Sequence, residues 1–251
     1  MSAFSFNLPK DCNVLVKEDS SISPGVLIAE SEIFSSEIVI PVASDLGINP
    51  SDINNYLLKK NGDFVNRFDQ IALKKGNIFK KNKYISSPVN GKLISINEEK
   101  GEVVLGFERN EYKLISPGLG KVLEIKDGNI KIDFQGKEIG LEDGGGMVSF
   151  GELNIISGFD EEVDHLLIND SHNGKILLGG IWGKIDLAKA KAVGVCGIIG
   201  KQIVSDFIKE FQDNPVFSIG TISEKNYSVS KGHNEKLLII DGDNKLICLL
   251  K

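Results

Sequence analysis

Residues 84–156 alternate apolar with polar side chains, and turn signals interrupt them roughly every 8–12 residues. These signals include Asn90-Gly91, Lys100-Gly101 and Asp127-Gly128. Asn-Gly and Asp-Gly pairs favour the tight turns that join antiparallel strands. The spacing therefore predicts an all-β sandwich or barrel for this part of the chain.

Two internal repeats occur in the N-terminal part of the chain. Residues 15–29 ("LVKEDSSISPGVLIA") align without gaps with residues 58–72 ("LKKNGDFVNRFDQIA"), 43 residues later. The segments "SPVNGKLISI" and "SPGLGKVLEI" recur 29 residues apart, each with Ser-Pro, then Gly-Lys, then an apolar–polar–apolar strand. Proline stops one strand, and glycine permits the tight turn into the next. Each repeat predicts a strand-and-turn unit that occurs twice, and a short helix near Pro50 is expected between the copies of the first repeat.

The segment "NGDFVNRFDQIA", followed by "SSPVNGKLISI", resembles the G-D-x-V-x-x-G-x-x-I-A … S-P-x-x-G-x-V-x-x-I pattern of barrel-sandwich hybrid domains. Biotinyl and lipoyl carriers share this pattern with cation-efflux adaptor proteins and with parts of the β′ subunit of bacterial RNA polymerase. The matching residues are Gly62, Asp63, Val65, Ile71, Ala72, Ser87, Pro88 and Gly91. Phe68 stands where the pattern has glycine.

The carrier families present the lysine that is modified within Met-Lys-Met or Asp-Lys-Ala. Residues 73–84 ("LKKGNIFKKNKY") contain neither tripeptide. The resemblance therefore implies an unmodified relative of the biotinyl and lipoyl domains, with no cofactor. Over its whole length the chain resembles a bacterial family in which such a barrel precedes a small swivelling-type α/β domain.

Residues 174–220 predict alternating strands and helices. The expected strands are "GKILLGG", "VCGIIG" and "PVFSIG", and the helices between them are "KIDLAKAKAVG" and "KQIVSDFIKEF". In the first helix, Ile185, Ala188 and Ala192 recur at the spacing of one buried helix face. This order predicts a parallel sheet with right-handed crossovers. The C-terminal "KLLIIDGDNKLICLLK" predicts a hairpin that turns at Asp241-Gly242.

The same stretch resembles swivelling and protease-associated domains. They share a strand "GKI-apolar" followed by a helix that ends in "A-x-x-x-G-V-x-G-apolar-apolar". The phosphohistidine members of the swivelling group carry a histidine in a Gly-rich turn. This chain has no histidine between Asn173 and Gly232, which excludes that chemistry here.

An acidic run, "FDEEVDH" at residues 159–165, separates the two patterns and predicts a linker that opens a new domain. A chain of 251 residues suits two domains. The expected fold class is α+β. A β-rich barrel-sandwich hybrid domain over residues 1–157 precedes a small α/β domain with a parallel sheet over residues 158–251.

Each of the three expected parallel strands ends in glycine. Ligands of open parallel α/β sheets bind outside the carboxyl ends of the strands, where helix N-termini favour anions. The candidate residues for a small anionic ligand are Gly179, Gly180, Trp182, Gly200 and Thr221. Trp182 is the only tryptophan and would anchor a ligand or partner. Alternatively, the glycines close tight turns and Trp182 covers the sheet edge.

Basic residues gather in one part of an acidic chain. Residues 57–92 hold nine Lys or Arg and two Asp, a balance of +7, whereas the whole chain has a net charge of −6. The lysines that could bind a polyanion are Lys74, Lys75, Lys80, Lys81 and Lys83. Alternatively, they belong to a solvated hairpin whose charges discourage edge-to-edge pairing. The acidic net charge argues against nucleic acid as the main partner.

The cysteines Cys12, Cys196 and Cys248 are scattered and form no Cys-x-x-Cys, so we expect a reducing cytoplasm and no zinc site. Cys196 lies in the apolar run "VGVCGIIG" and is expected to be a small buried residue. No apolar run reaches the roughly 18 residues of a membrane helix.

Three functions are compatible with these patterns. The first is a non-catalytic binding or scaffold protein, whose partner is another protein, built on an unmodified biotinyl/lipoyl-like barrel. The second is an enzyme or sensor that binds a small anionic ligand at the strand ends of the C-terminal domain. The third is nucleic-acid contact through the Lys-rich hairpin. No metal site and no nucleophile–base pair is recognisable, which favours the first.

Overall fold

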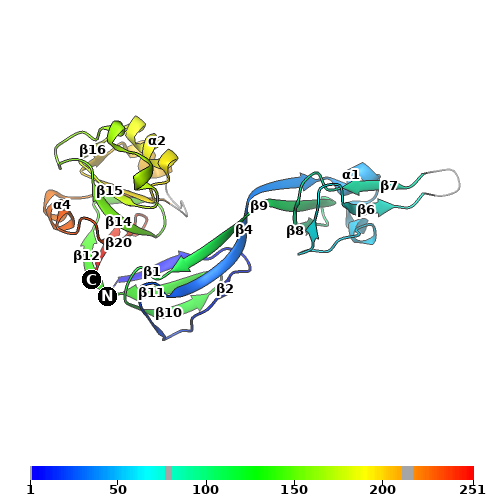
Figure 1. The fold of residues 1–251 in the computed structure, drawn as a ribbon, viewed down its shortest axis with the longest axis horizontal. Coiled ribbons are helices and arrows are strands. Elements are labelled where there is room, and N and C mark those ends of the chain that lie inside the picture. The colour runs from blue at the N-terminus through cyan, green and yellow to red at the C-terminus, as the bar shows by residue number, and fades with distance from the viewer. Residues whose placement is uncertain (1, 77–80, 211–216) are drawn as a thin grey trace. The chain divides into compact units, whose positions relative to one another are not determined.

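The computed structural model describes residues 2–76, 81–210 and 217–251, and it divides the chain into two compact units (Figure 1). Unit 1 comprises Met1–Glu30 and Lys113–Lys251, and unit 2 comprises Ser31–Tyr112. Unit 2 is thus inserted into unit 1. Two long strands, β4 (Leu27–Ile40) and β9 (Glu102–Ile115), carry the chain from one unit to the other.

This division differs from the expected one at residues 157 and 158. The strands β12 (Gly136–Gly140), β13 (Asp143–Gly145) and β14 (Ser149–Ile155) precede that boundary, yet they belong to the sheet of the C-terminal part. A boundary at residue 157 would cut this sheet. The expected α+β class, with strands predominating, is confirmed.

Unit 1 begins with a four-stranded sheet in the order β1-β11-β10-β3. Its strands are β1 (Ser2–Asn7), β3 (Ser21–Ile22), β10 (Gly120–Lys126) and β11 (Asn129–Phe134). The short strand β2 (Asn13–Val14) pairs with β4 instead. Phe4, Phe6 and Phe134 pack together inside the four-stranded sheet, with ring centroids 6.2 and 6.4 Å apart. Aromatic side chains of this size supply much of the apolar area that a small sheet can bury.

Unit 2 combines β4 and β9 with short strands and one helix. Its other elements are α1 (Val42–Leu46), the 3₁₀ helix η1 (Pro50–Asn55), β5 (Phe64–Val65), β6 (Gln70–Lys74), β7 (Lys83–Ser86) and β8 (Gly91–Asn97). The helix expected near Pro50 is therefore a 3₁₀ helix. Ile53, Val65 and Leu93 are buried in one apolar core, which holds the elements of this unit together.

The two sequence repeats fold into the same arrangement twice. Gly120 of β10 pairs with Ile22 of β3, and Gly91 of β8 pairs with Val65 of β5. Both pairs follow the offsets of 43 and 29 residues between the repeats. The backbone N–H of Leu15 donates to Ile28 at 2.8 Å, and the N–H of Leu58 donates to Ile71 at 2.9 Å. The repeats predicted from the sequence are therefore confirmed, with one copy in each unit.

The Ser-Pro turns of the second repeat also have matching bonds. The buried Ser87 hydroxyl donates to the carbonyl of Val89, and the buried Ser116 hydroxyl donates to that of Gly118, both at 2.7 Å. A Cβ atom on Gly91 would lie 2.4 Å from the carbonyl oxygen of Gly106 on the neighbouring strand. Glycine is required there because two strands approach closely, rather than for the turn alone.

The C-terminal part of unit 1 is an eight-stranded sheet in the order β12-β21-β20-β14-β15-β17-β19-β13. Its remaining strands are β15 (Ile176–Leu178), β17 (Gly197–Gly200), β19 (Ser218–Thr221), β20 (Leu237–Asp241) and β21 (Leu246–Leu250). The neighbours β14, β15, β17 and β19 are parallel, and the other pairs are antiparallel. A separate parallel pair is formed by β16 (Ile181–Trp182) and β18 (Gln202–Ile203).

Helices cover both faces of this sheet. The covering helices are α2 (Lys184–Val193), α3 (Ser205–Glu210) and α4 (Glu224–Lys231). The 3₁₀ helices η2 (His165–Leu167) and η3 (Asp170–His172) bury no residue. Leu177 packs in one cluster with Leu187 of α2, whereas Ile176 and Leu178 pack in another with Tyr227 of α4. Because both faces are buried, the strands are continuously apolar. Helix α4 was not expected from the sequence.

Two local predictions in this sheet were wrong. Ile185 on α2 is 67% exposed, and Leu187 and Ala190 are buried instead. The Asp186 carboxylate accepts the N–H of Gly183 at 2.8 Å and caps the helix, which sets its rotation. The final hairpin has a four-residue loop rather than a two-residue turn, since Asp241 pairs with Leu246.

Candidate functional site

The strand end at Gly180 is covered by the chain that follows β14. A Cβ atom on Gly180 would lie 2.3, 2.4 and 2.5 Å from the carbonyl oxygens of Gly158, Glu161 and Phe159. Its N–H donates to the hydroxyl of Ser157 at 2.9 Å. Residues 158–161 therefore lie directly on this strand end, and their carbonyl oxygens would repel an anion.

Trp182 is only 1% exposed and belongs to the core. Its indole nitrogen donates to the carbonyl of Ile199 at 3.2 Å. A Cβ atom on Gly200 would lie 2.5 Å from the indole ring, so glycine leaves the room that the ring occupies. These contacts bring Gly180, Trp182 and Gly200 together, and the indole ring occupies the space beside Gly200.

The other two predicted strand-end residues also have structural partners. A Cβ atom on Gly179 would lie 2.6 Å from the side chain of Val163. The Thr221 hydroxyl accepts the N–H of Asp143 at 3.0 Å, and the Thr221 carbonyl accepts the N–H of Glu142 at 2.8 Å. Thr221 thus holds β13 against β19.

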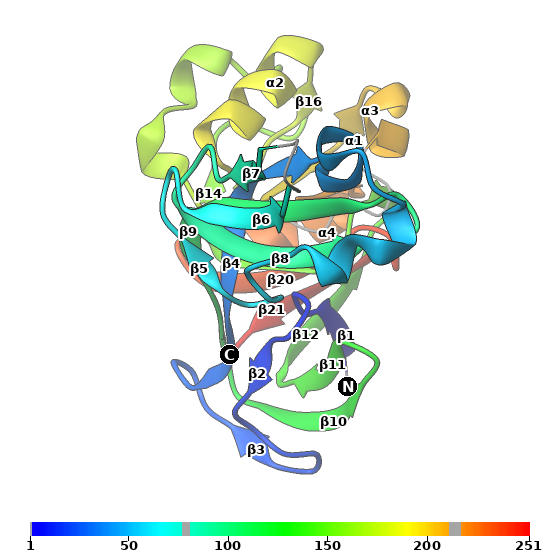
Figure 2. The same ribbon diagram turned by 90° about the vertical axis from the view of Figure 1, so that its right-hand side faces the viewer.

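Two of the five candidate lysines cap a helix. Helix α1 lies beside β6 and β7 (Figure 2). The Lys74 ammonium donates to the carbonyls of Leu46 and Gly47 at 3.0 and 2.7 Å. The Lys83 ammonium donates to the carbonyl of Asp45 at 2.8 Å. Cations at the carbonyls that end a helix satisfy free acceptors and oppose the helix dipole.

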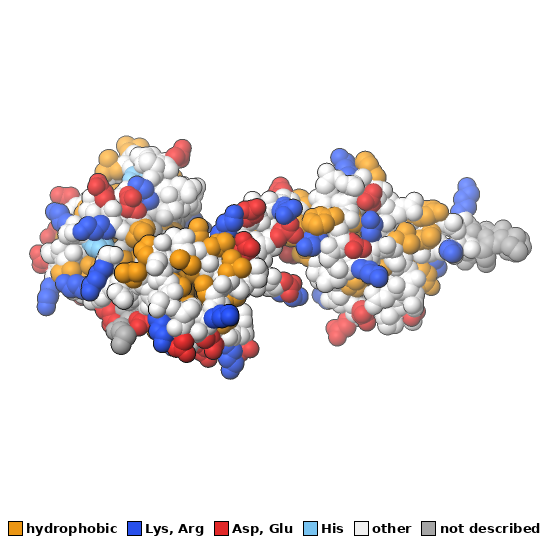
Figure 3. All heavy atoms as spheres, turned by 60° about the horizontal axis from the view of Figure 1, so that its bottom comes forward, with side chains coloured by type: hydrophobic (Ala, Val, Ile, Leu, Met, Phe, Trp, Pro, Cys, Tyr) orange, Lys and Arg blue, Asp and Glu red, His pale blue; other side chains and the backbone are white. Residues whose placement is uncertain are grey.

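Lys75 and Lys81 make no such contact with any residue that the structure describes. Lys75 and Lys81 are exposed. Lys80 lies outside the described residues. More widely, acidic and basic side chains are mixed over the face of the molecule that Figure 3 presents.

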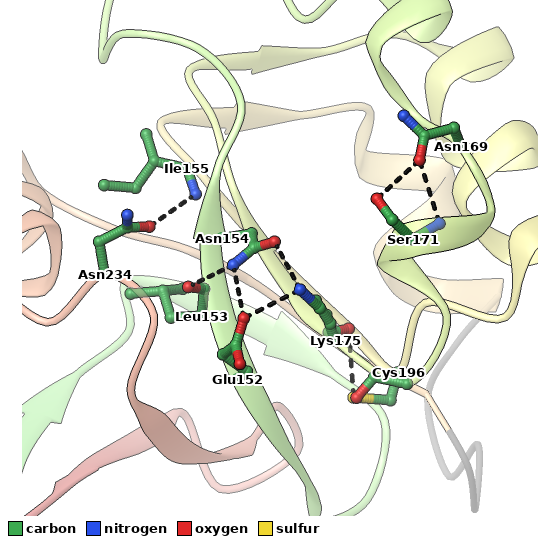
Figure 4. Close-up of polar contacts among 10 residues, drawn as sticks. Glu152, Leu153, Asn154, Ile155, Asn169, Ser171, Lys175, Cys196 and Asn234 are labelled. Atoms are coloured by element: carbon green, nitrogen blue, oxygen red, sulfur yellow. Dashed lines mark hydrogen bonds and ion pairs between the residues drawn. The ribbon is translucent and has the colours of Figure 1, made fainter.

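A polar cluster that the sequence did not predict joins β14 to the residue that precedes β15 (Figure 4). The Lys175 ammonium lies 2.9 Å from Glu152 Oε1 and 3.1 Å from Asn154 Oδ1. The Asn154 amide donates to the same Glu152 oxygen at 3.1 Å. The hydrogen bonds from Lys175 and Asn154 hold the pKa of the Glu152 carboxyl below its usual value.

Cys196 lies at the edge of this cluster (Figure 4). Its thiol is within 3.2–3.4 Å of the carbonyl oxygens of Phe150, Gly174 and Lys175. Burial raises the pKa of this thiol to about 12. The group is therefore a protonated donor to backbone carbonyls rather than a nucleophile. Cys196 is partly buried, whereas the sequence predicted a small buried residue.

Two other hydrogen bonds drawn in Figure 4 link side chains to backbone N–H groups outside the polar cluster. In Figure 4, Asn234 accepts the N–H of Ile155 at 3.2 Å, and Asn169 accepts the N–H of Ser171 at 3.0 Å. Within residues 2–76, 81–210 and 217–251, no group of three or more His, Cys, Asp or Glu could hold a metal ion. Nor does any helix of these ranges combine the length and apolar character needed to cross a membrane.

An exposed aromatic pair stands out in unit 2. Phe68 has a backbone φ of +76° and is 73% exposed. Its N–H donates to the Ser87 carbonyl at 2.8 Å, and the Asp69 N–H donates to the Asn66 carbonyl at 2.9 Å. These bonds hold Phe68 in the left-handed region, which non-glycine residues rarely adopt. In the other copy of the repeat the equivalent residue is Gly25, with φ of +82°.

Phe64 lies four residues before Phe68 and is 57% exposed, because the next residue of β5, Val65, faces the core. A cationic side chain lies over each of the two rings. The Arg67 guanidinium lies 4.9 Å from the centroid of Phe68, and the Lys92 ammonium lies 5.4 Å from that of Phe64. We refer to Phe64, Arg67, Phe68 and Lys92 as the aromatic surface.

Comparisons with models of protein families and with curated proteins give no match. Among solved structures, the chain is similar to a UPF0107 protein determined in solution by NMR as a structural genomics target. The two are 11% identical, the match covers 46% of this chain and 100% of that one, and the TM-score is 0.35. Likeness at this level assigns neither a family nor a function.

Proposed function

We propose that the protein is a non-catalytic binding module whose partner is another protein. Its unit 2 is an unmodified barrel-sandwich hybrid domain, and the aromatic surface is the contact. The single observation that carries the proposal is the conformation and exposure of Phe68. The first repeat supports it, since the equivalent turn in unit 1 is built with glycine.

The backbone conformation of Phe68 costs free energy. A non-glycine residue in the left-handed region costs about 1–2 kcal/mol. Phe68 recovers little of this by burial, because 73% of the residue is exposed. Gly25 makes the same turn without that cost. A residue that strains the backbone and leaves an apolar ring in solvent is better explained by a contact than by folding.

The surface also indicates the character of the partner. Aromatic rings and arginine are the side chains that most often dominate protein–protein binding energies. Here the cations Arg67 and Lys92 flank the rings, and residues 57–92 carry a balance of +7. The partner is therefore a protein with an apolar recess rimmed by carboxylates. Binding should weaken as salt is raised, since the Arg67 guanidinium is exposed. Lys92 is half-buried and already pairs with Glu32 at 3.0 Å, so it contributes less to this effect.

Affinity capture from an extract of the native host tests the proposal. Wild-type protein, Phe68→Gly and Leu166→Ser are immobilised in parallel. Leu166 is 77% exposed in unit 1 and serves as the control for loss of an exposed apolar side chain. We expect a protein that is retained by wild type and Leu166→Ser and lost with Phe68→Gly. If all three variants retain the same proteins, the aromatic surface is not a binding site.

The other two functions have less support. Carbonyl oxygens surround the strand end at Gly180, and Trp182 is buried, so an anionic ligand there would need residues 158–161 to move. Two of the lysines proposed for nucleic-acid contact, Lys74 and Lys83, are hydrogen-bonded to the carbonyls at the end of helix α1. The free cysteines remain compatible with the cytoplasm as the proposed location.

A further inference from the structure

Unit 1 contains a hollow of about 510 Å³ that lies away from the predicted strand ends. It is bounded by the last turn of α4 and the residues after it, and by the paired strands β12 and β21. Leu249 and Leu250, which are 5% and 6% exposed, and the half-buried Val229 give it an apolar floor. Lys137, His233 and Lys236 supply polar groups at its rim.

The charges of the rim are not compensated locally. None of the side chains that line the hollow is acidic, and Lys251 also belongs to its lining. The Lys137 and Lys236 ammonium groups make no ion pair or side-chain hydrogen bond with any residue in the described ranges. Lys137 lies on the edge strand β12, where a lysine also discourages edge pairing. Lys236 lies outside any strand, so edge protection does not explain it.

His233 is held in one orientation. Its Nε2 atom lies 2.9 Å from the carbonyl oxygen of Leu237, and a carbonyl only accepts, so Nε2 carries the hydrogen. The Nδ1 atom is then left as a hydrogen-bond acceptor. The His233 N–H donates to Ser230 and its carbonyl accepts from Lys236, at 2.8 and 3.2 Å. This turn keeps His233 and Lys236 next to each other.

We propose that this hollow binds a small amphiphilic anion, with a carboxylate or phosphate head on a short hydrocarbon body. The head would pair with Lys137 and Lys236, and the body would cover Leu249 and Leu250. Ligand sites in proteins combine an apolar lining with a few converging polar groups in this way. The site is independent of the aromatic surface and of the proposed protein partner.

Titration of the full chain followed by NMR tests the proposal. The probes are octanoate and octyl phosphate, with inorganic phosphate as a head without a body and octyltrimethylammonium as a body with the opposite charge. We expect octanoate or octyl phosphate to shift the His233 ring protons and the Leu249 signals saturably. Comparing these two probes identifies the head group. Lys137→Glu/Lys236→Glu should weaken binding at least tenfold, and the exposed Lys189→Glu, on α2, should leave it unchanged.

Four results would overturn the proposal. They are the absence of a saturable shift up to about ten millimolar probe, equal binding of the cationic amphiphile, inorganic phosphate binding as tightly as octyl phosphate, and unchanged affinity of the double variant. The single variant Lys236→Met removes one charge without adding another. It should weaken binding severalfold, and wild-type affinity in this variant would equally count against the site.

Discussion

Replacing Gly180 by alanine measures directly whether the strand ends of the C-terminal sheet are closed. The added Cβ would lie 2.3–2.5 Å from three backbone oxygens, so residues 158–161 must move by nearly an ångström. Overpacking of this kind costs typically about 1–3 kcal/mol. Movement would also strain two hydrogen bonds, each contributing about 1 kcal/mol: the Gly180 N–H donates to the Ser157 hydroxyl, and the Gly180 carbonyl accepts the Lys201 N–H. We expect a loss of about 3–4 kcal/mol.

Gly140 provides the matched control, because a Cβ there meets no atom within 4 Å and the glycine lies in the exposed part of β12. Alanine should stabilise this strand position by about 0.5–1 kcal/mol, since glycine loses more freedom on folding. The same chemical change at the two positions should therefore give unfolding free energies that differ by about 4 kcal/mol, combining the two estimates above.

Urea unfolding followed by tryptophan fluorescence is the assay. Trp182 is the single tryptophan, is buried, and lies two residues from Gly180. In a thermal scan, each kcal/mol corresponds to about 2–4 °C for a chain of this size. If Gly180→Ala came within about 1 kcal/mol of Gly140→Ala, residues 158–161 would not lie on the strand end. The anion site at Gly179 and Gly180 would then regain its support.

Two further predictions concern Phe68 and Glu152. Phe68→Gly should be more stable than Phe68→Ala by about 0.5–1 kcal/mol in urea unfolding, because alanine keeps the left-handed strain. At Phe64, whose φ is not positive, Phe64→Ala should be more stable than Phe64→Gly. If glycine were the more stable variant at both positions, or alanine at both, the left-handed turn assigned to Phe68 would be contradicted. Hydrogen bonds from Lys175 and Asn154 lower the pKa of the Glu152 carboxyl in the folded state. This carboxylate therefore stabilises the fold at pH values above its ordinary pKa of 4.5. The stabilisation is lost as the pH falls through the lower folded-state pKa. Glu152→Gln should thus cost about 0.5 kcal/mol at neutral pH and nothing near pH 2; a difference that persists in acid would mean that the pair is not ionic.

Local chemistry that recurs in the sequence was enough to predict the repeats. Ser-Pro and Gly-Lys at fixed spacing define the same turns in both copies, and buried Ser87 and Ser116 show that these bonds stay within a few residues. The strands and helices between residues 174 and 220 were recognisable for a similar reason, since apolar runs and helical spacing are local signals. The sequence also marked Phe68 as the residue that departs from glycine.

Long-range pairing decided the rest. No local sequence pattern near residues 136–155 predicts that these strands join a sheet with β15 and β21. The hydrogen bonds of a strand are made with segments far away in the chain. Burial of Trp182 under residues 158–161, and the use of Lys74 and Lys83 to end α1, depend in the same way on which segments meet. The strain and exposure of Phe68, on which the proposed function rests, also depend on tertiary structure, because its N–H donates to the Ser87 carbonyl, 19 residues later in the chain.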